Sequence, residues 1–557
     1  MNEEEINVVV GNDLSEVAGV LNRFLKNNEN VFSFPYLSEN SNRVTFWSAL
    51  FEHLQKKTSV SVHVLCLATI RLLSRDKTDL ENLICEKWMT ALIERAGLYS
   101  FLDPEEGCTE IQLPEKEIVV EALKCLCNIA FNSDVARALC AHTEIARGLV
   151  ARLRSYKEIP FKEDIMLFDM KLLFILTALR QDIKQKIKNE LHGLDYLISC
   201  LNELVVEASL AEIGATASSG TGEQGNQYCL LSDNQHAIGC EILKTQFNLI
   251  LQSGTEEVVD EAEEAMYLKL MPCLTSLLYA HTSSEEKLME LHSNVANLLT
   301  SVPPAFYQYL TPKLDEGERA QYVFNGRNMD ALQSLLHLLL YRLSITTSSK
   351  NQYENLSPIL TVFNKSARGC REQRKYLRHT VLPPLRDVSR PPEKGNTLRN
   401  QLCRLLTSPV TSVRDLVAEF LFILCKEKVG RMVKYTGFGN AAGHLAQKGL
   451  LGGARGLGGA GGSGTTEYSS SSDDSDTEEY REAEPHIDPV VGCTRPPRSN
   501  PFEGMTEEQK EYEAMKLVNL FDKMVTGGPV RPARVGADGR PQPLEHVLQL
   551  RDQTPHN

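Results

Sequence analysis

Apolar residues recur along the chain with the period of an α-helix, and hardly any segment alternates as a strand would. From about residue 13 to 445, Leu, Ile, Phe or Cys recur at i, i+3, i+4 and i+7, which places them on one helix face. Several of these segments resemble variants of one unit, and they begin at Cys66, Leu123, Ile242, Asn294, Ile359 and Phe420. The pattern predicts an all-α protein built from repeated helices.

The repeated helices predict an elongated array. Helix-pair units of about 40 to 47 residues fit the stretch and would give on the order of nine repeats. Because one unit cannot bury its apolar face alone, we expect an armadillo/HEAT-like solenoid over residues 1–445, with a concave binding surface. Two polar segments, Gly214 to Asn234 and Val302 to Phe324, are predicted to be loops within the array.

The composition changes near residue 446. A glycine-rich run from Gly449 to Gly464 is followed by an acidic stretch from Thr465 to Glu484. Sequences of this kind have few apolar groups to bury, so they stay extended and disordered. We therefore predict a disordered linker over residues 446–504.

A helix signal returns after this linker. Thr506-Glu-Glu-Gln509 has the form of a capping box, which marks the start of a helix. Apolar residues then share one helix face, and these are Ala514, Leu517, Val518, Phe521 and Met524. The pattern predicts an amphipathic docking helix over residues 505–525, with a disordered tail over residues 526–557.

Composition narrows the class of protein. The net charge of −14 argues against nucleic acid as the main partner. No run approaches the roughly 18 apolar residues of a membrane helix, and the acidic start MNEEE does not resemble a secretion signal. We expect a cytoplasmic monomer whose cysteines, such as Cys66, Cys125, Cys127 and Cys425, are buried thiols. Cys125-Leu-Cys127 does not have the spacing of a zinc site, and we predict no metal and no cofactor.

Motifs that would carry chemistry are missing. Gly456, Gly458 and Gly461 match G-x-G-x-x-G, but no strand precedes them and no helix follows. The chain has no phosphate-binding P-loop, no H-E-x-x-H and no G-x-S-x-G. We predict that the protein is not an enzyme, although an unlisted catalytic constellation stays open as an alternative.

Basic residues gather at two places in this acidic chain. Arg374 and Arg378 lie one turn apart in the basic stretch Lys365 to Arg404, and Arg71 and Arg75 repeat this spacing. Such faces are commonly solvated; alternatively, they accept carboxylates or a peptide C-terminus. Amides near the ends of repeat helices, Asn128 among them, either bind a partner's backbone or close their own helix. By default, Phe168 belongs to the core.

Particular strings resemble a known family, synembryn. They include YTGFGNAAG from Tyr435, MTEEQKEYEAMKLVN from Met505, CLATIRLLSRD from Cys66 and LKCLCNIAFNS from Leu123. Synembryn is the cytosolic guanine-nucleotide exchange factor and folding chaperone for heterotrimeric G-protein α subunits (Gα). The resemblance runs in the same order from about residue 60 to 525.

The resemblance implies a solenoid whose concave face holds the C-terminal helix of Gα, so that GDP leaves and nucleotide-free Gα is stabilised. It places Arg71, Arg75, Arg374 and Arg378 against carboxylates, Asn128 against the peptide backbone and Phe168 against apolar side chains. The helix from Thr506, with Leu517, Val518 and Phe521, resembles a second anchor on Gα. A non-catalytic armadillo adaptor that binds an extended peptide is the alternative.

The acidic stretch adds a regulatory hypothesis. Ser470 and Ser475 each have an acidic residue three positions on, as acid-directed kinases require, and they resemble the family's regulatory phosphosites. Phosphate groups would add negative charge to a segment that is already acidic. We therefore expect a phosphoprotein of G-protein signalling that an acid-directed kinase modifies. Recruitment to the cell cortex or plasma membrane together with Gα is a further expectation.

Overall fold

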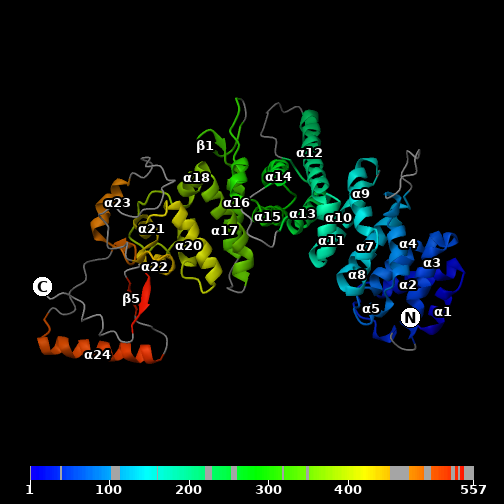
Figure 1. Ribbon diagram of the computed structural model, residues 1–557, viewed down its shortest axis with the longest axis horizontal. Helices are drawn as coiled ribbons and strands as arrows, with labels where there is room; N and C mark the ends of the chain where they lie inside the picture. The colour runs from blue at the N-terminus through cyan, green and yellow to red at the C-terminus, as the bar shows by residue number, and fades with distance from the viewer. Residues whose placement is uncertain are drawn as a thin grey trace. The chain divides into compact units, whose positions relative to one another are not determined.

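The computed structural model describes residues 2–37, 41–101, 113–159, 161–219, 229–251, 260–316, 319–345, 351–451, 476–494, 504–527, 533–536 and 540–544. The chain divides into two compact units, Met1–Val302 and Pro303–Asn557, which are treated separately (Figure 1). Within the described residues, the strands are only two or three residues long and helices supply the rest of the regular structure. The predicted all-α fold class is confirmed.

Helices supply the regular structure of the described residues of the first unit. Its α-helices are α1 (Glu3–Val10), α2 (Leu14–Asn27), α3 (Asn42–Gln55), α4 (Val60–Leu73), α5 (Leu80–Leu83), α6 (Glu86–Arg95), α7 (Lys116–Asn132), α8 (Asp134–His142), α9 (Ile145–Ser155), α10 (Lys162–Leu179), α11 (Gln181–Gln185), α12 (Gly193–Ser219), α13 (Asp233–Ile250), α14 (Glu261–Tyr279) and α15 (Glu285–Leu299). Short 3-10 turns cover Pro35–Leu37, Lys57–Ser59, Tyr99–Phe101 and Tyr156–Glu158, and a π-helical turn covers Lys186–Glu190.

Helices α4, α7, α10, α13 and α15 form one stacked layer of the first unit, in which each packs against the next. Helix α7 shows why the sequence favours this arrangement. Val119, Leu123, Leu126 and Ala130, spaced by four, three and four residues, are all fully buried. Burial of one such large aliphatic side chain is worth about 1.5 to 3 kcal/mol. The stack follows the helical repeat that the sequence predicts.

The predicted loop from Gly214 to Asn234 is shorter in the structure. Helix α12 continues to Ser219, and α13 begins at Asp233 with Ser232 as its cap. The segment up to Ser219 has no proline to end a helix that is already nucleated, so propagation continues through it. The second predicted loop, Val302 to Phe324, contains a 3-10 helix over Pro304–Leu310 and the first strand of a hairpin.

A buried ion pair joins α9 to α10. Arg152 and Asp169 are both fully buried, with 3.4 Å between the Arg152 Nε and the Asp169 Oδ2. The Tyr156 hydroxyl donates to the same Oδ2 at 2.7 Å, and the Arg152 Nη2 donates to the Ala96 carbonyl at 3.0 Å. Burial raises the pKa of Asp169, although the Arg152 charge and the Tyr156 hydrogen bond oppose the rise. These contacts join α9 and α10 inside the core.

The second unit is also mainly helical. Its α-helices are α16 (Asp330–Ile345), α17 (Gln352–Gly369), α18 (Arg371–Val381), α19 (Leu398–Leu405), α20 (Thr411–Leu424), α21 (Val429–Thr436), α22 (Phe438–Gln447), α23 (Glu478–Ala483) and α24 (Glu507–Thr526). Three antiparallel hairpins pair β1 (Val323–Phe324) with β2 (Arg327–Asn328), β3 (Ile487–Asp488) with β4 (Cys493–Thr494), and β5 (Ala533–Val535) with β6 (Pro541–Pro543). A 3-10 turn covers Glu484–His486.

Helices α17 and α20 form the centre of the second unit. The rings of Phe363 and Phe420 stack with centroids 5.5 Å apart, and both side chains are fully buried. The Asn364 Nδ2 donates to the Leu416 carbonyl at 3.0 Å across the same contact. An aromatic pair of this kind is worth about 0.5 to 1.5 kcal/mol beyond its burial.

Residues 476–494 are folded, although the sequence places them in the disordered linker 446–504. Thr477 caps α23, whose Tyr480 is 6% exposed, and Lys434 pairs with Asp476. The carbonyls of Pro489 and Val490 accept hydrogen bonds from the first amides of α22, each at 2.9 Å. This segment therefore supplies hydrogen-bond acceptors to amides at the N-terminus of α22, which have no partner within their own helix. The acidic composition of the segment does not reveal this role.

Gly437 and Gly492 allow that contact. Both have positive φ, 77° and 75°, where a side chain would be strained. A Cβ on Gly437 would lie 3.0 Å from the Val491 carbonyl oxygen, so the two backbones approach closely because neither residue has a side chain. The first glycine of the YTGFGNAAG string, Gly437, is therefore required by this close approach of two backbones.

Most of the described cysteines are buried, as the sequence predicts, and Cys85 is exposed. Cys66, Cys125, Cys127 and Cys425 are all buried, and the first three lie on the stacked helices α4 and α7. Burial raises the pKa of the Cys66 thiol to about 12, so this thiol stays protonated and unreactive at neutral pH.

None of the described helices is long and apolar enough to cross a membrane.

Candidate functional site

A row of charged and aromatic side chains crosses the stacked layer of the first unit. Arg71 comes from α4, Glu121 and Lys124 from α7, and Phe168 and Lys171 from α10. The Glu121 carboxylate binds the Arg71 Nε at 2.9 Å and the Lys124 Nζ at 2.7 Å. The ammonium groups of Lys124 and Lys171 each lie 5.2 Å from the centre of the Phe168 ring. We call this set the inner row.

Phe168 is not a core residue, which corrects the default expectation from its apolar surroundings in the sequence. It is half-buried, whereas its neighbour Asp169 is fully buried. Asp169 points into the core, where it pairs with Arg152, and Phe168 precedes it by one position, so the Phe168 side chain is turned about 100° away around the helix. A half-exposed ring between two lysines offers an apolar surface and can also bind cations on its face.

Asn128 connects the row to the preceding helix. Its Nδ2 donates to the Arg71 carbonyl at 3.2 Å, so its hydrogen bond joins α7 to α4 instead of closing its own helix. Asn248 repeats the contact on α13, where its Nδ2 lies 3.4 Å from the Phe174 carbonyl and 3.1 Å from the Thr177 hydroxyl. Both amides are half-buried. Each hydrogen bond joins one helix of the stacked layer to the helix before it.

The inner row continues on α13 through residues that sequence reasoning missed. The Lys244 Nζ lies 2.8 Å from the Glu241 carboxylate and 5.0 Å from the centre of the Phe174 ring. Helices α7 and α13 thus share the pattern Glu-x-Leu-Lys-x-x-x-Asn, over Glu121–Asn128 and Glu241–Asn248. This internal repeat is the sequence signal that could have found Lys124 and Lys244.

Arg75 lies beyond the end of α4. Its Nη1 donates to the Glu29 carbonyl at 2.8 Å, and its guanidinium carbon lies 5.4 Å from the centre of the Phe32 ring. Phe32 is 68% exposed. The adjacent Asp76 accepts a hydrogen bond from the Phe34 amide at 2.7 Å, which ties the same loop to α4. Arg75 is therefore held in place by a loop that presents an exposed aromatic ring.

Arg374 and Arg378 lie on α18 of the second unit, and both side chains are half-buried. The Arg374 Nη1 donates to the Ala367 carbonyl at 2.8 Å. Burial lowers the pKa of Arg431, and the charge of Arg378 lowers it further, so the Arg431 guanidinium lies within electrostatic reach of Arg378. Because Arg71 and Arg75 lie in the other unit, the expectation that all four arginines form one site stays a prediction.

Helix α24 carries its apolar side chains on the surface. The predicted capping box is present, with the Gln509 amide 3.3 Å from the Thr506 hydroxyl and the Thr506 amide 3.1 Å from the Gln509 side chain. Leu517 is 57% exposed, Phe521 is 37% exposed and Val518 is half-buried. Exposed apolar residues on an amphipathic helix are typical of a docking element. Ser470 and Ser475 lie outside the described residues.

Comparisons with known proteins identify the family of this chain. A family model described as "Guanine nucleotide exchange factor synembryn" matches residues 66–540. "Chaperone Ric-8A" of Danio rerio is 40% identical over 95% of this chain and 93% of its own length. "Chaperone Ric-8" of Drosophila pseudoobscura pseudoobscura is 36% identical over 100% of this chain and 98% of its own length.

Among solved structures, the crystal structure of SYS-1 is 13% identical and covers 78% of this chain and 64% of its own chain. Its TM-score of 0.39 is too low to bear on either fold or function. The two relatives reported above are both named chaperones. The family match and these two relatives, which align over nearly their full length, show that the chain belongs to the synembryn family of guanine nucleotide exchange factors.

Proposed function

We propose that this protein is a guanine-nucleotide exchange factor and folding chaperone for G-protein α subunits, and that the inner row binds the C-terminal helix of Gα. The observation that carries the proposal is the juxtaposition of Arg71, Lys124 and Phe168 on three consecutive stacked helices. A peptide helix that ends in a carboxylate and has apolar side chains needs cations, an apolar ring and amides to bind it. Family membership supports the same activity.

The electrostatics of the inner row suit an acidic peptide end. Arg71, Lys124, Lys171 and Lys244 outnumber the two carboxylates, Glu121 and Glu241, that lie among them. Glu121 already holds two of the cations, so an incoming carboxylate must compete with it. Arg71 is 30% exposed on its side chain, which leaves it accessible to a partner. Charge-assisted hydrogen bonds of this kind are worth about 1.5 to 3 kcal/mol each.

The proposed mechanism is differential binding without a bond-making active site. A surface that binds the C-terminal helix of Gα better in the nucleotide-free state than in the GDP-bound state shifts the equilibrium toward release. The acceleration is limited by the difference between those two affinities. The same preference stabilises a Gα chain that has not yet bound nucleotide, which is what a chaperone of this client must do.

GDP release from purified Gα tests the proposal directly. We expect the intact protein to increase the rate of GDP release from Gα, because it binds the nucleotide-free state in preference. The measurement is loss of fluorescent GDP from loaded Gα with and without the protein. A peptide-binding adaptor would bind Gα and leave the rate unchanged, and that result would refute the exchange activity.

Truncation tests the second anchor. A chain that ends at residue 500 lacks α24, so we expect slower exchange on whole Gα with unchanged binding of a Gα C-terminal peptide. The sharper variant is Leu517→Asp/Phe521→Asp, which places charge on the exposed apolar face of α24. The matched control is Lys516→Ala, because the native Lys516 side chain pairs with Glu513 on the same helix. If the intact protein, the truncated chain and both substituted variants increased GDP release from Gα equally, α24 would not be an anchor.

A further inference from the structure

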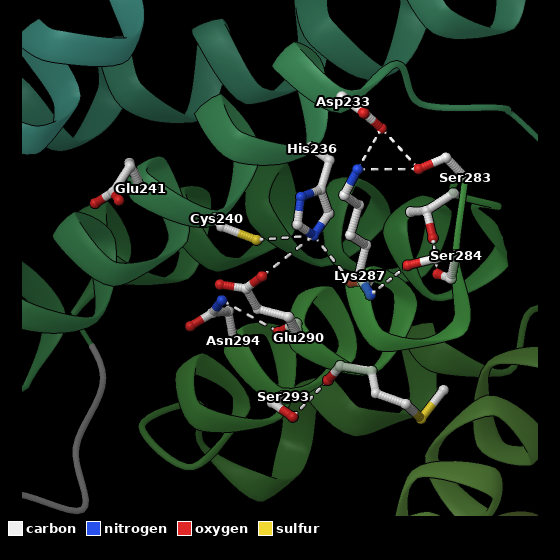
Figure 2. A network of polar contacts seen from close by, with 12 residues as sticks. Asp233, His236, Cys240, Glu241, Ser283, Ser284, Lys287, Glu290, Ser293 and Asn294 are labelled. Carbon is white, nitrogen blue, oxygen red and sulfur yellow. Dashed lines mark hydrogen bonds and ion pairs between the residues drawn. The ribbon is translucent and has the colours of Figure 1, made fainter.

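Helices α13 and α15 of the first unit meet at a cluster of side chains that the proposed function does not use (Figure 2). His236 and Cys240 lie one turn apart on α13, and Glu290 lies opposite them on α15. His236 and Cys240 are 4% and 3% exposed, whereas the side chain of Glu290 is 60% exposed. The cluster is therefore closed on the inside and open to solvent at the carboxylate.

The Nε2 atom of His236 faces three electron-rich atoms at once. The Lys287 carbonyl oxygen lies 2.9 Å from it, the Cys240 Sγ 3.5 Å and the Glu290 Oε2 3.9 Å. A neutral imidazole has at most one proton on this nitrogen, so it can donate to only one of the three. A cation in the place of that proton would attract the nitrogen, the sulfur and the carboxylate together.

The spacing of these atoms fits a tetrahedral metal ion. Bonds of about 2.0 to 2.3 Å to nitrogen, oxygen and sulfur place two tetrahedral ligands roughly 3.3 to 3.8 Å apart. The observed Nε2 to Sγ separation of 3.5 Å falls in that range, and the Nε2 to Oε2 separation of 3.9 Å lies just above it. The three ligand atoms all lie within 4.8 Å of one another. A small rotation of the exposed Glu290 side chain would complete the geometry.

Two lysines lie near the cluster, and each is paired with a carboxylate. The Lys244 Nζ lies 2.8 Å from the Glu241 carboxylate on the same helix. The ammonium of Lys287 points away from the cluster, since it lies 2.6 Å from the Asp233 carboxylate and 3.1 Å from the Ser283 hydroxyl. Asn294 is one turn beyond Glu290 on α15 and lies beside the thiol, with its Nδ2 donating to the Glu290 carbonyl at 3.1 Å, so the fourth ligand would be a water. Nitrogen, thiolate and carboxylate together are ligands that zinc accepts.

We propose that His236, Cys240 and Glu290 bind a divalent transition metal with the ligand preferences of zinc, and that this ion clamps α13 to α15. The ion would have a structural role, because it would join two helices of the stack. Helix α13 also carries Glu241, Lys244 and Asn248, so the clamp would hold the end of the inner row in place. The inference does not depend on whether the inner row binds Gα.

The experiment uses Co²⁺ as a spectroscopic probe on the intact, metal-stripped protein. Titration is expected to produce near-ultraviolet charge-transfer absorption from a thiolate bound to Co²⁺, saturating at one ion per chain, and Zn²⁺ is expected to abolish it. Glu290→Gln removes an exposed ligand without disturbing the core, and it should weaken Co²⁺ affinity at least about tenfold. Cys240→Ser should abolish the charge-transfer absorption.

The matched control is Cys273→Ser, which removes another buried cysteine, on α14, and should leave the titration unchanged. Circular dichroism of each variant shows whether it is folded. Thermal unfolding with Zn²⁺ gives a second readout, because the ion should raise the melting temperature of the wild type more than that of Glu290→Gln at the same Zn²⁺ concentration. Absence of thiolate absorption in the wild type, or its persistence in Cys240→Ser, would overturn the proposal.

Discussion

Replacing Asp169 with asparagine should lower the free energy of unfolding of the first unit by about 3 to 5 kcal/mol, because the change leaves a buried guanidinium without its counter-charge. Arg152 and Asp169 have no exposed side-chain surface, so water cannot take over the lost interaction. Asparagine has nearly the shape of aspartate, so the loss would come from charge and hydrogen bonding instead of packing. We expect this to be the largest stability effect among the predicted substitutions.

Urea unfolding followed by circular dichroism measures the effect as a shift in the midpoint of the transition. Glu144→Gln is the matched control, since it removes the exposed partner of Arg147 on α9 and should cost less than about 1 kcal/mol. The double replacement Arg152→Met/Asp169→Leu should recover much of the stability, because two apolar side chains of similar size need no charge partner. A midpoint for Asp169→Asn no lower than that of Glu144→Gln would contradict the prediction.

The same variant connects the core to the candidate site. Asp169 is adjacent to Phe168, and the buried pair joins α10 to α9. Loss of the pair would therefore disturb the position of the Phe168 ring between Lys124 and Lys171. Changes in partner binding by Asp169→Asn should accordingly be interpreted only together with its stability.

Local patterns in the sequence predict the helical elements well. The i, i+3, i+4 and i+7 spacing identifies helices such as α7 because burial of one face is decided within a few turns. The capping box at Thr506 is equally local, since both hydrogen bonds join residues three apart. The cysteines on α4 and α7 follow the same apolar faces, and their burial is as predicted.

Contacts between distant residues could not be predicted in this way. Arg71 is separated from Glu121 by 50 positions, and Arg152 is paired with an aspartate inside an apolar run that reads as core. The segment 476–494 has the composition of a disordered tail, yet its backbone carbonyls bind the start of α22. Such partners depend on the fold as a whole and leave no local pattern.

The candidate metal cluster illustrates the same limit. His236 and Cys240 have a spacing of four, which many helices contain by chance, and their third partner comes from α15. For the inner row, by contrast, the resemblance to synembryn points to Arg71, Asn128 and Phe168, and the structure places all three on adjoining stacked helices. The pairing of Arg71 with Glu121 depends on the packing of α4 against α7, and the contact of Lys124 with Phe168 depends on the packing of α7 against α10.

Under the proposed function, Arg71→Ala/Arg75→Ala should weaken binding of a Gα C-terminal peptide by at least tenfold and leave the melting temperature nearly unchanged. Each arginine would lose a charge-assisted contact worth about 1.5 to 3 kcal/mol. Without Arg71, the Glu121 carboxylate keeps only Lys124 as a partner. Its negative charge is then less neutralised and repels the peptide carboxylate that should bind there. Fluorescence anisotropy of a labelled peptide measures the affinity.

Matched variants identify the cause of this loss. Glu121→Gln should strengthen peptide binding, because it releases Arg71 from a competing carboxylate, whereas Arg147→Ala on α9 should have no effect. A peptide with an amidated C-terminus should bind the wild type more weakly and should lose little further affinity in the double variant, since the group that the arginines recognise is already missing. The pair Arg374→Ala/Arg378→Ala on α18 is assayed in parallel. Unchanged affinity in both double variants would show that neither basic face binds the peptide end. If a double variant lost the same affinity for the free peptide as for the amidated peptide, its arginines would contact acidic side chains instead of the terminal carboxylate.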